Sequence, residues 1–147
     1  MVGLSYDLES YRNYLIMSNS KHILVEGSND KRVFMLFIDE LLHQSGSETA
    51  YSKIVVDTAE QLLDFEKSLG NRAKVETVCQ RLIGQYCARK LVGFVDREFR
   101  EFDRIPLVRD RIGAHKVCGR LVWSRGHSVE NYYFDFETLR VPLRAFS

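Results

Sequence analysis

The stretch KHILVEGSND, residues 21–30, decides the fold of this chain. Its aliphatic run, residues 23–25, predicts a short strand buried on both faces, because no polar residue alternates with the apolar ones. Glu26 follows at once, and Ser28 or Asn29 can cap a helix that begins there. A carboxylate therefore stands at the end of a strand and the start of a loop, a position that commonly caps a helix and that can also deliver a side chain to a shared binding site.

The same order of elements recurs along the chain. The segments KIVVD and LVGFVD are further apolar runs that end in an acid, and a fourth apolar run covers residues 121–123. Apolar residues at helical spacing separate these runs, in residues 4–17, 28–42, 59–69 and 72–89. Strands that alternate with helices predict an α/β fold with a mostly parallel, four-stranded, Rossmann-like sheet and helices on both faces.

The length and composition predict a single domain. The chain has 147 residues, and a hydrophobic content of 45% is enough to fill one core. We interpret residues 1–147 as one domain, and the apolar ending VPLRAFS leads us to expect that it is the N-terminal part of a longer protein. A formal net charge of +1 excludes a global field that would attract nucleic acid, so any such binding has to come from a local patch.

Three further features of the composition limit the cellular setting. The three cysteines are an odd number at wide spacing, which argues against disulfides and structural zinc. Charged residues interrupt the first twenty positions, and no apolar run reaches the length of a membrane span. We therefore expect a cytoplasmic protein that does not associate with a membrane.

Acidic side chains follow two of the predicted strands. Glu26 and Asp30 flank the turn after the first strand, and Asp96 and Glu98 follow the strand at residues 91–95. Because the carboxyl ends of parallel strands meet at one edge of a sheet, we expect these acids to share a crevice. Carboxylates so close together repel one another, and a hard divalent cation such as Mg²⁺ relieves that repulsion. The remaining strand-end acid, Asp57, is interpreted as a cap or loop acid.

Two motifs resemble a known family. ILVEGSNDKRVF, followed by LVGFVDREF, resembles the Toprim domain of topoisomerases, primases and OLD-type nucleases. The later segment GHSVENYYF is similar to the His-x-x-Glu-Asn-Tyr element of a Toprim-like family linked to anti-phage defence, which includes the nuclease effector of the PARIS system. The resemblance extends over residues 21–134, which is most of the chain.

The resemblance implies a function and a set of site residues. It implies a Toprim-like fold and a nuclease that depends on Mg²⁺ or Mn²⁺, with nucleic acid, including RNA such as tRNA, as substrate and an ATPase as partner. Glu26, Asp96 and Glu98 match the catalytic acids, and the same three residues with Asp30 match the metal ligands. Glu98 departs from the usual Asp-x-Asp pattern, since its extra methylene group moves the carboxylate outward.

Four other residues have two interpretations each. His127 and Glu130 are three apart, so in a helix they share a face and could enter the same crevice, or they are a polar loop residue and a brace for a neighbour. Lys31 and Arg97 could hold phosphate beside the acids, although long basic side chains in such positions usually extend into solvent.

Two other functions remain open on the sequence. The chain could be a catalytically silent Toprim-like module that docks on an ATPase partner, and the near-neutral charge and the substituted Glu98 are compatible with that role. Nucleotidyl transfer, as in primases, is a third interpretation, but the chain has no evident P-loop. The sequence leaves both the choice between DNA and RNA and the existence of a homo-oligomer undecided.

Overall fold

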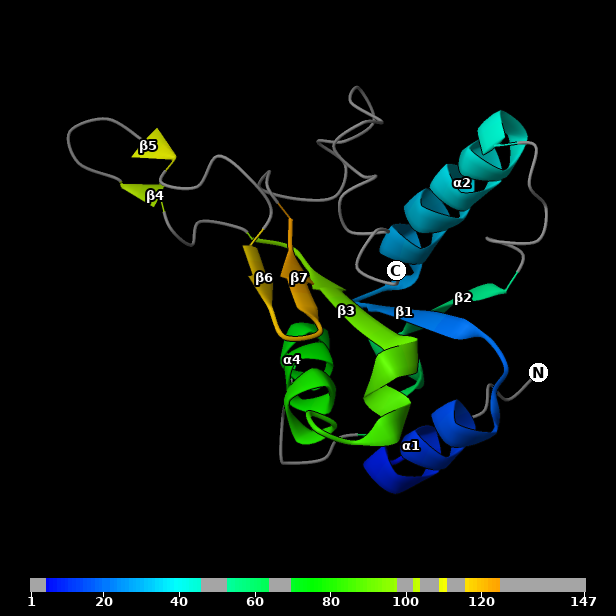
Figure 1. The fold of residues 1–147 in the computed structure, drawn as a ribbon. Coiled ribbons are helices and arrows are strands. Elements are labelled where there is room, and N and C mark those ends of the chain that lie inside the picture. The colour runs from blue at the N-terminus through cyan, green and yellow to red at the C-terminus, as the bar shows by residue number, and fades with distance from the viewer. Residues whose placement is uncertain are drawn as a thin grey trace.

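A computed structural model describes residues 5–45, 53–63, 70–97, 102–103, 109–110 and 116–124. Its centre is a five-stranded sheet in the order β2-β1-β3-β7-β6 (Figure 1). Strands β1, β2, β3 and β7 run parallel to one another, and the edge strand β6 pairs antiparallel with β7. The strands are β1 (Lys21–Val25), β2 (Ile54–Thr58), β3 (Leu91–Val95), β6 (Lys116–Cys118) and β7 (Leu121–Trp123). Strands β4 (Phe102–Asp103) and β5 (Arg109–Asp110) pair antiparallel in a separate two-stranded sheet.

Helices cover both faces of the sheet. Helix α2 (Ser28–Ser45) lies on one face, and α1 (Leu8–Met17) and α4 (Asn71–Arg81) lie on the other (Figure 1). Two short 3₁₀ helices, η1 (Ala59–Gln61) and η2 (Tyr86–Lys90), follow β2 and precede β3. Among the described residues, no helix is long and apolar enough to cross a membrane.

The prediction of an α/β fold with a mostly parallel, Rossmann-like sheet is confirmed, and the sheet holds one strand more than predicted. The additional strand is β6, whose residues are largely exposed and therefore form no apolar run. It returns to β7 through Gly119, whose φ of 62° is a conformation that glycine adopts without strain. The helix predicted over residues 72–89 ends at Arg81 instead. The chain then turns at Gly84, where φ is 79°, before it enters η2.

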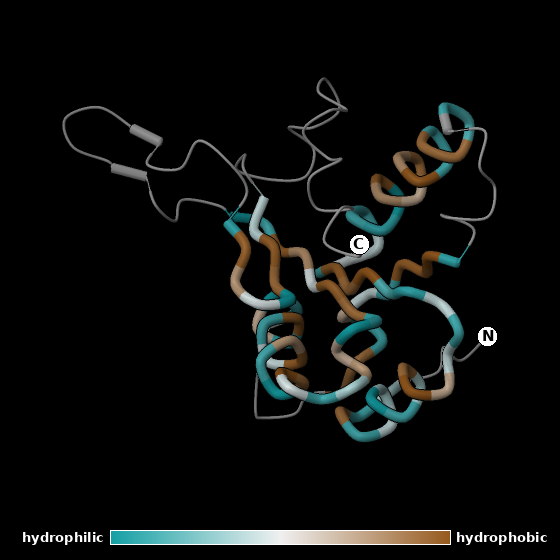
Figure 2. The backbone as a smooth tube through the Cα atoms, viewed as in Figure 1, coloured by the Kyte–Doolittle hydropathy of each residue, from teal (hydrophilic) through white to brown (hydrophobic). Residues whose placement is uncertain are grey.

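Each face of the sheet has its own apolar core. On the α2 face, strand residues such as Ile23, Val25 and Phe94 pack against α2, and the rings of Phe34 and Phe94 meet edge to face at 4.9 Å between centroids. On the other face, Leu24 and Val95 belong to the core beneath α1 and α4. Figure 2 shows the hydrophobic colour running along β1, β2 and β3. The consecutive buried positions of these strands explain why their sequences lack polar alternation.

The strand order places a topological switch point at the carboxyl ends of β1 and β3. After β1 the chain passes through α2 on one face to reach β2, and it then returns through α4 on the opposite face to reach β3 on the other side of β1 (Figure 1). Strands β1 and β3 are therefore neighbours whose following connections diverge. In open α/β sheets such a switch point is where ligands bind, outside the carboxyl ends of the strands.

Candidate functional site

Two of the predicted acids meet at this switch point. Glu26 follows β1 and Asp96 follows β3, and the backbone N–H of Asp96 donates a hydrogen bond to Glu26 Oε1 at 2.9 Å. Both residues are half-buried. The predicted convergence of acids from the first and third strands is therefore present for this pair, although the two positions are 70 residues apart in the sequence.

The hydrogen bond has an unusual acceptor. The register pairs Leu24 with Gly93, so a regular parallel ladder would next direct the Asp96 N–H to the backbone carbonyl of Glu26. The Glu26 side chain supplies the oxygen instead. The backbones of β1 and β3 therefore separate at this point, while a carboxylate is drawn into the space between them. A hydrogen bond from an amide to a carboxylate is stronger than one between neutral groups. This bond therefore fixes the Glu26 side chain between the ends of β1 and β3.

Two more acids lie beside the N-terminus of α2, one on the helix itself and one in η1. Asp30 Oδ2 accepts a hydrogen bond from the Gly27 N–H at 3.1 Å, which closes the first turn of the helix. Glu60, in η1 after β2, lies with Oε1 3.4 Å from the Ser28 N–H. The sequence analysis missed Glu60, because it follows a strand by two residues and belongs to no recognisable motif. Negative charge is favoured at a helix N-terminus, so both acids also stabilise α2.

The two predicted phosphate-binding residues differ in exposure. Lys31 is half-exposed in the first turn of α2, at the same end of the sheet as Glu26. Arg97 has no exposed surface at all. The general expectation that a long basic side chain extends into solvent is therefore wrong for Arg97, and its burial argues against contact with a phosphate from solution.

Three predicted site residues, Glu98, His127 and Glu130, lie outside the described residues. Within the described part of the chain, no three His, Cys, Asp or Glu side chains form a group that could hold a metal ion. The described acids do supply hard oxygen donors at an open edge. Mg²⁺ commonly takes one or two carboxylates and completes its shell with water and substrate phosphates, so the pair Glu26 and Asp96 fits part of such a site.

A second polar cluster, which the sequence analysis missed, lies between the sheet and α1. His22 of β1 has Nδ1 2.7 Å from Asp57 Oδ2 and Nε2 2.7 Å from Ser18 Oγ. The hydroxyl of Tyr11, on α1, donates to the same Asp57 oxygen at 2.9 Å. We call Tyr11, Ser18, His22 and Asp57 the buried cluster. The interpretation of Asp57 as a cap or loop acid is wrong, because it lies within β2 and is buried.

The hydrogen bonds of the buried cluster form one chain of donors and acceptors. A carboxylate only accepts, so His22 Nδ1 donates to Asp57, and the other ring nitrogen, Nε2, lies within hydrogen-bond distance of the Ser18 hydroxyl. Acyl-transfer enzymes use the same order of hydroxyl, imidazole and carboxylate, but His22 here has no exposed surface through which to meet a substrate. The cluster therefore holds α1 on the sheet.

Burial and the Asp57 charge affect the titration of Tyr11. The pKa of Tyr11 is raised well above its ordinary value, first because the hydroxyl is buried and then because Asp57 repels the phenolate.

Lys90 closes the end of α1 nearby, where its Nζ donates to the Leu15, Ile16 and Ser18 carbonyls at 3.1, 3.0 and 2.6 Å. These bonds satisfy carbonyls that the helix itself leaves open.

Comparison with known proteins adds no assignment to this geometry. No protein-family model matches the chain, and no curated protein matches it in sequence. The acids at the carboxyl ends of β1 and β3 are therefore the starting point for a functional assignment. Carboxylates are the ligands that hard cations such as Mg²⁺ prefer, and metal-assisted hydrolysis at phosphorus uses ligands of this type.

Proposed function

We propose that this chain is a metal-dependent nuclease domain of the Toprim type, which hydrolyses phosphodiester bonds in nucleic acid. The observation that carries the proposal is the 2.9 Å hydrogen bond from the Asp96 N–H to Glu26 Oε1. It joins two strand-end acids across the switch point of the sheet, where ligands of α/β folds bind. Each of these acids also stands in one of the two motifs that resemble the Toprim domain.

The site residues have distinct roles in this proposal. Glu26 and Asp96, with Asp30 and Glu98, would hold Mg²⁺ or Mn²⁺, and a cation held there would supply stabilisation of the charge on the phosphate oxygens. The Glu26 carboxylate, whose Oε1 is fixed by the Asp96 amide, is proposed as the general base that accepts a proton from the attacking water. The half-exposed ammonium of Lys31 attracts the phosphate to the edge. His127 and Glu130, which lie outside the described residues, are proposed as additional residues of the site.

The resemblance extends the proposal to substrate and partner. It supports RNA such as tRNA as the substrate, a cytoplasmic role in anti-phage defence and an ATPase that restrains the nuclease. The near-neutral formal charge of +1 fits a protein that binds nucleic acid through one local site rather than through its whole surface.

Substitution of Glu26 tests the proposal. Glu26→Gln keeps an oxygen that accepts from the Asp96 N–H but removes the charge, and Glu26→Ala removes both. We expect each to lower Mg²⁺-dependent cleavage of RNA and single-stranded DNA by at least about 100-fold, because a ligand is lost and not merely a residue that supports one. Thermal unfolding of Glu26→Gln should remain that of the original chain.

Asp39→Asn is the matched control, since Asp39 is an exposed acid on α2 away from its first turn. It should cleave at the rate of the unmodified protein. Cleavage by Glu26→Gln at the same rate as Asp39→Asn would contradict the assignment of the site.

One observation favours a second function, that of a silent interaction module docked on an ATPase. The Glu26 carboxylate already bonds a backbone amide, a structural role that requires no metal. Calorimetric titration with Mn²⁺ separates the two functions. A nuclease site binds the ion and loses that binding in Glu26→Gln, whereas a docking module has no reason to bind it at this edge.

A further inference from the structure

The last described residue, Ser124, holds the other side of Asp96. Ser124 follows β7, is wholly buried, and donates its backbone N–H to the Val95 carbonyl at 3.0 Å. Its side-chain Oγ accepts from the backbone N–H of Arg97 at 2.8 Å. Ser124 therefore bonds the residue before Asp96 and the residue after it.

The second of these bonds replaces a ladder bond. The register pairs Val95 with Trp123, so the next rung of a regular parallel ladder would direct the Arg97 N–H to the Ser124 backbone carbonyl. The Ser124 hydroxyl takes that place. Glu26 Oε1 does the same on the β1 side of Asp96. At the switch point, two side-chain oxygens thus continue the ladders of β3 after the neighbouring backbones have separated.

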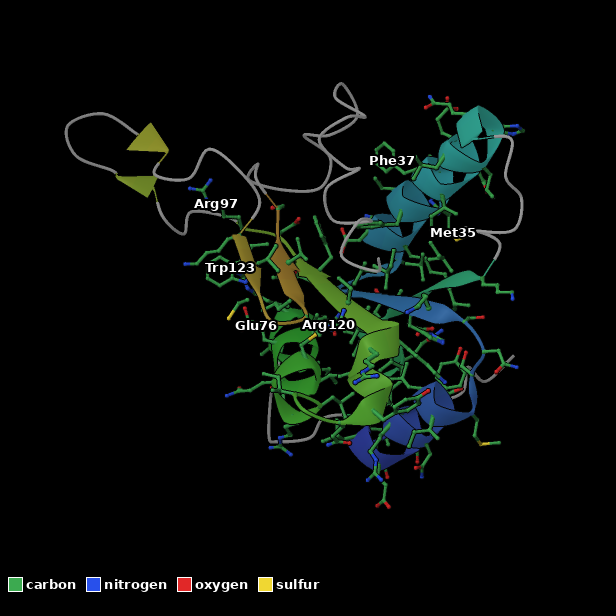
Figure 3. All side chains as sticks on the ribbon, in the orientation of Figure 1. Met35, Phe37, Glu76, Arg97, Arg120 and Trp123 are labelled. Atoms are coloured by element: carbon green, nitrogen blue, oxygen red, sulfur yellow. The ribbon has the colours of Figure 1, made fainter. Side chains whose placement is uncertain are left out.

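The arrangement fixes the backbone around Asp96. The Val95 carbonyl and the Arg97 N–H are bonded to Ser124, and the Asp96 N–H is bonded to Glu26. The Arg97 side chain, labelled in Figure 3, has no exposed surface, so the residue after Asp96 is itself buried. The direction in which the Asp96 carboxylate leaves the chain therefore depends on the Ser124 hydroxyl.

We propose that Ser124 is a positioning residue, whose hydroxyl fixes the backbone that carries the Asp96 carboxylate at the carboxyl ends of β1 and β3. The proposal rests on the proposed function, since it assigns to Ser124 the support of a metal ligand in that site. Partners that orient a ligand typically account for 10–100-fold in metal affinity. Loss of the Ser124 hydroxyl would also leave the buried Arg97 N–H without an acceptor. The backbone around Asp96 would then have to rearrange, because an unsatisfied buried N–H is costly.

The test compares substitutions of Ser124 by Mn²⁺ calorimetry without substrate and by amide hydrogen exchange at Arg97. Ser124→Ala removes the acceptor, and we expect Mn²⁺ affinity to fall by about 10-fold or more. The Arg97 amide should exchange faster. Ser124→Thr keeps the hydroxyl and should restore the affinity. Ser124→Cys retains most of the volume with a weak acceptor, so it repeats the test should the alanine variant fail to fold.

Thr58→Val is the matched control, because Thr58 is also a buried hydroxyl residue at the carboxyl end of a strand, but of β2. It should bind Mn²⁺ like the unmodified chain. Unchanged Mn²⁺ affinity in both Ser124→Ala and Ser124→Cys overturns the positioning role and leaves the proposed function standing. Absence of Mn²⁺ binding by the unmodified chain overturns the proposed function, and the role of Ser124 with it.

Discussion

The buried cluster and the strand-end acids are two polar sites on one sheet, and they differ in where their charges lie along the strands. His22 and Asp57 are within β1 and β2, sealed beneath α1. Glu26 and Asp96 stand one residue beyond β1 and β3, half-exposed (Figure 1). A shift of a few residues along a strand therefore separates a carboxylate that stabilises the fold from one that can meet a ligand.

The difference teaches how to divide structural from functional acids in this protein. Asp57 accepts from two side chains inside the core, where loss of either partner leaves a buried polar group unsatisfied. Glu26 accepts from a backbone amide at an edge that water reaches. Substitutions in the buried cluster should therefore change stability, and substitutions at the strand ends should change activity.

The strongest test of this division is Asp57→Ala. It leaves the Tyr11 hydroxyl and the His22 ring without their shared acceptor, and we expect it to lower the free energy of unfolding by about 2–6 kcal/mol, because each buried group left unsatisfied costs about 1–3 kcal/mol. Urea denaturation measures the loss. Cleavage per folded molecule should not change, and a specific loss of activity in folded Asp57→Ala would break the division.

Next in size is Asp96→Asn, which keeps the backbone bond to Glu26 and removes only the side-chain charge. Cleavage should fall by about 100-fold, equivalent to about 2.7 kcal/mol in the activation free energy. The free energy of unfolding should change by less than about 1 kcal/mol, because Asn is nearly isosteric with Asp and leaves no cavity where the buried Asp96 Oδ1 stands. A large loss of stability with full activity would show that Asp96 belongs with the structural acids.

The smallest of these effects is expected for Tyr11→Phe, which removes one hydrogen bond to Asp57 and should cost about 1–2 kcal/mol at neutral pH. The cost should shrink as pH rises above about 10. In that range the unfolded chain loses the Tyr11 proton while the folded chain retains it, because the pKa of Tyr11 is raised in the fold. Stability of the unmodified chain therefore falls with pH, and Tyr11→Phe lacks that contribution.

Urea denaturation of both chains between pH 7 and 11 would measure this convergence. Burial also raises the pKa of Cys79 to about 12, which adds an alkaline loss of stability common to both chains, so their difference reports Tyr11 alone. A constant gap across the range would mean that Tyr11 titrates in the folded protein and is not sealed in the cluster.

The apolar runs and their spacing were sufficient to predict the α/β fold and the acids at the strand ends. Residues such as Ile23 and Phe94 lie in consecutive buried positions, and their runs show that pattern without any knowledge of the partner strands. The exposed strand β6 and the break at Gly84 escaped prediction, because neither changes the local hydrophobic period.

The sequence by itself thus determined which segments become strands and that Glu26 and Asp96 each follow one. Only the tertiary structure decided that β1 and β3 are neighbours, that Glu26 Oε1 bonds the Asp96 amide, and that Asp57 is buried with His22 and Tyr11. The physical reason is that strand order and side-chain pairing depend on contacts between residues far apart in the chain. Hydrophobic periodicity records whether a residue is buried, but not which distant residue it meets.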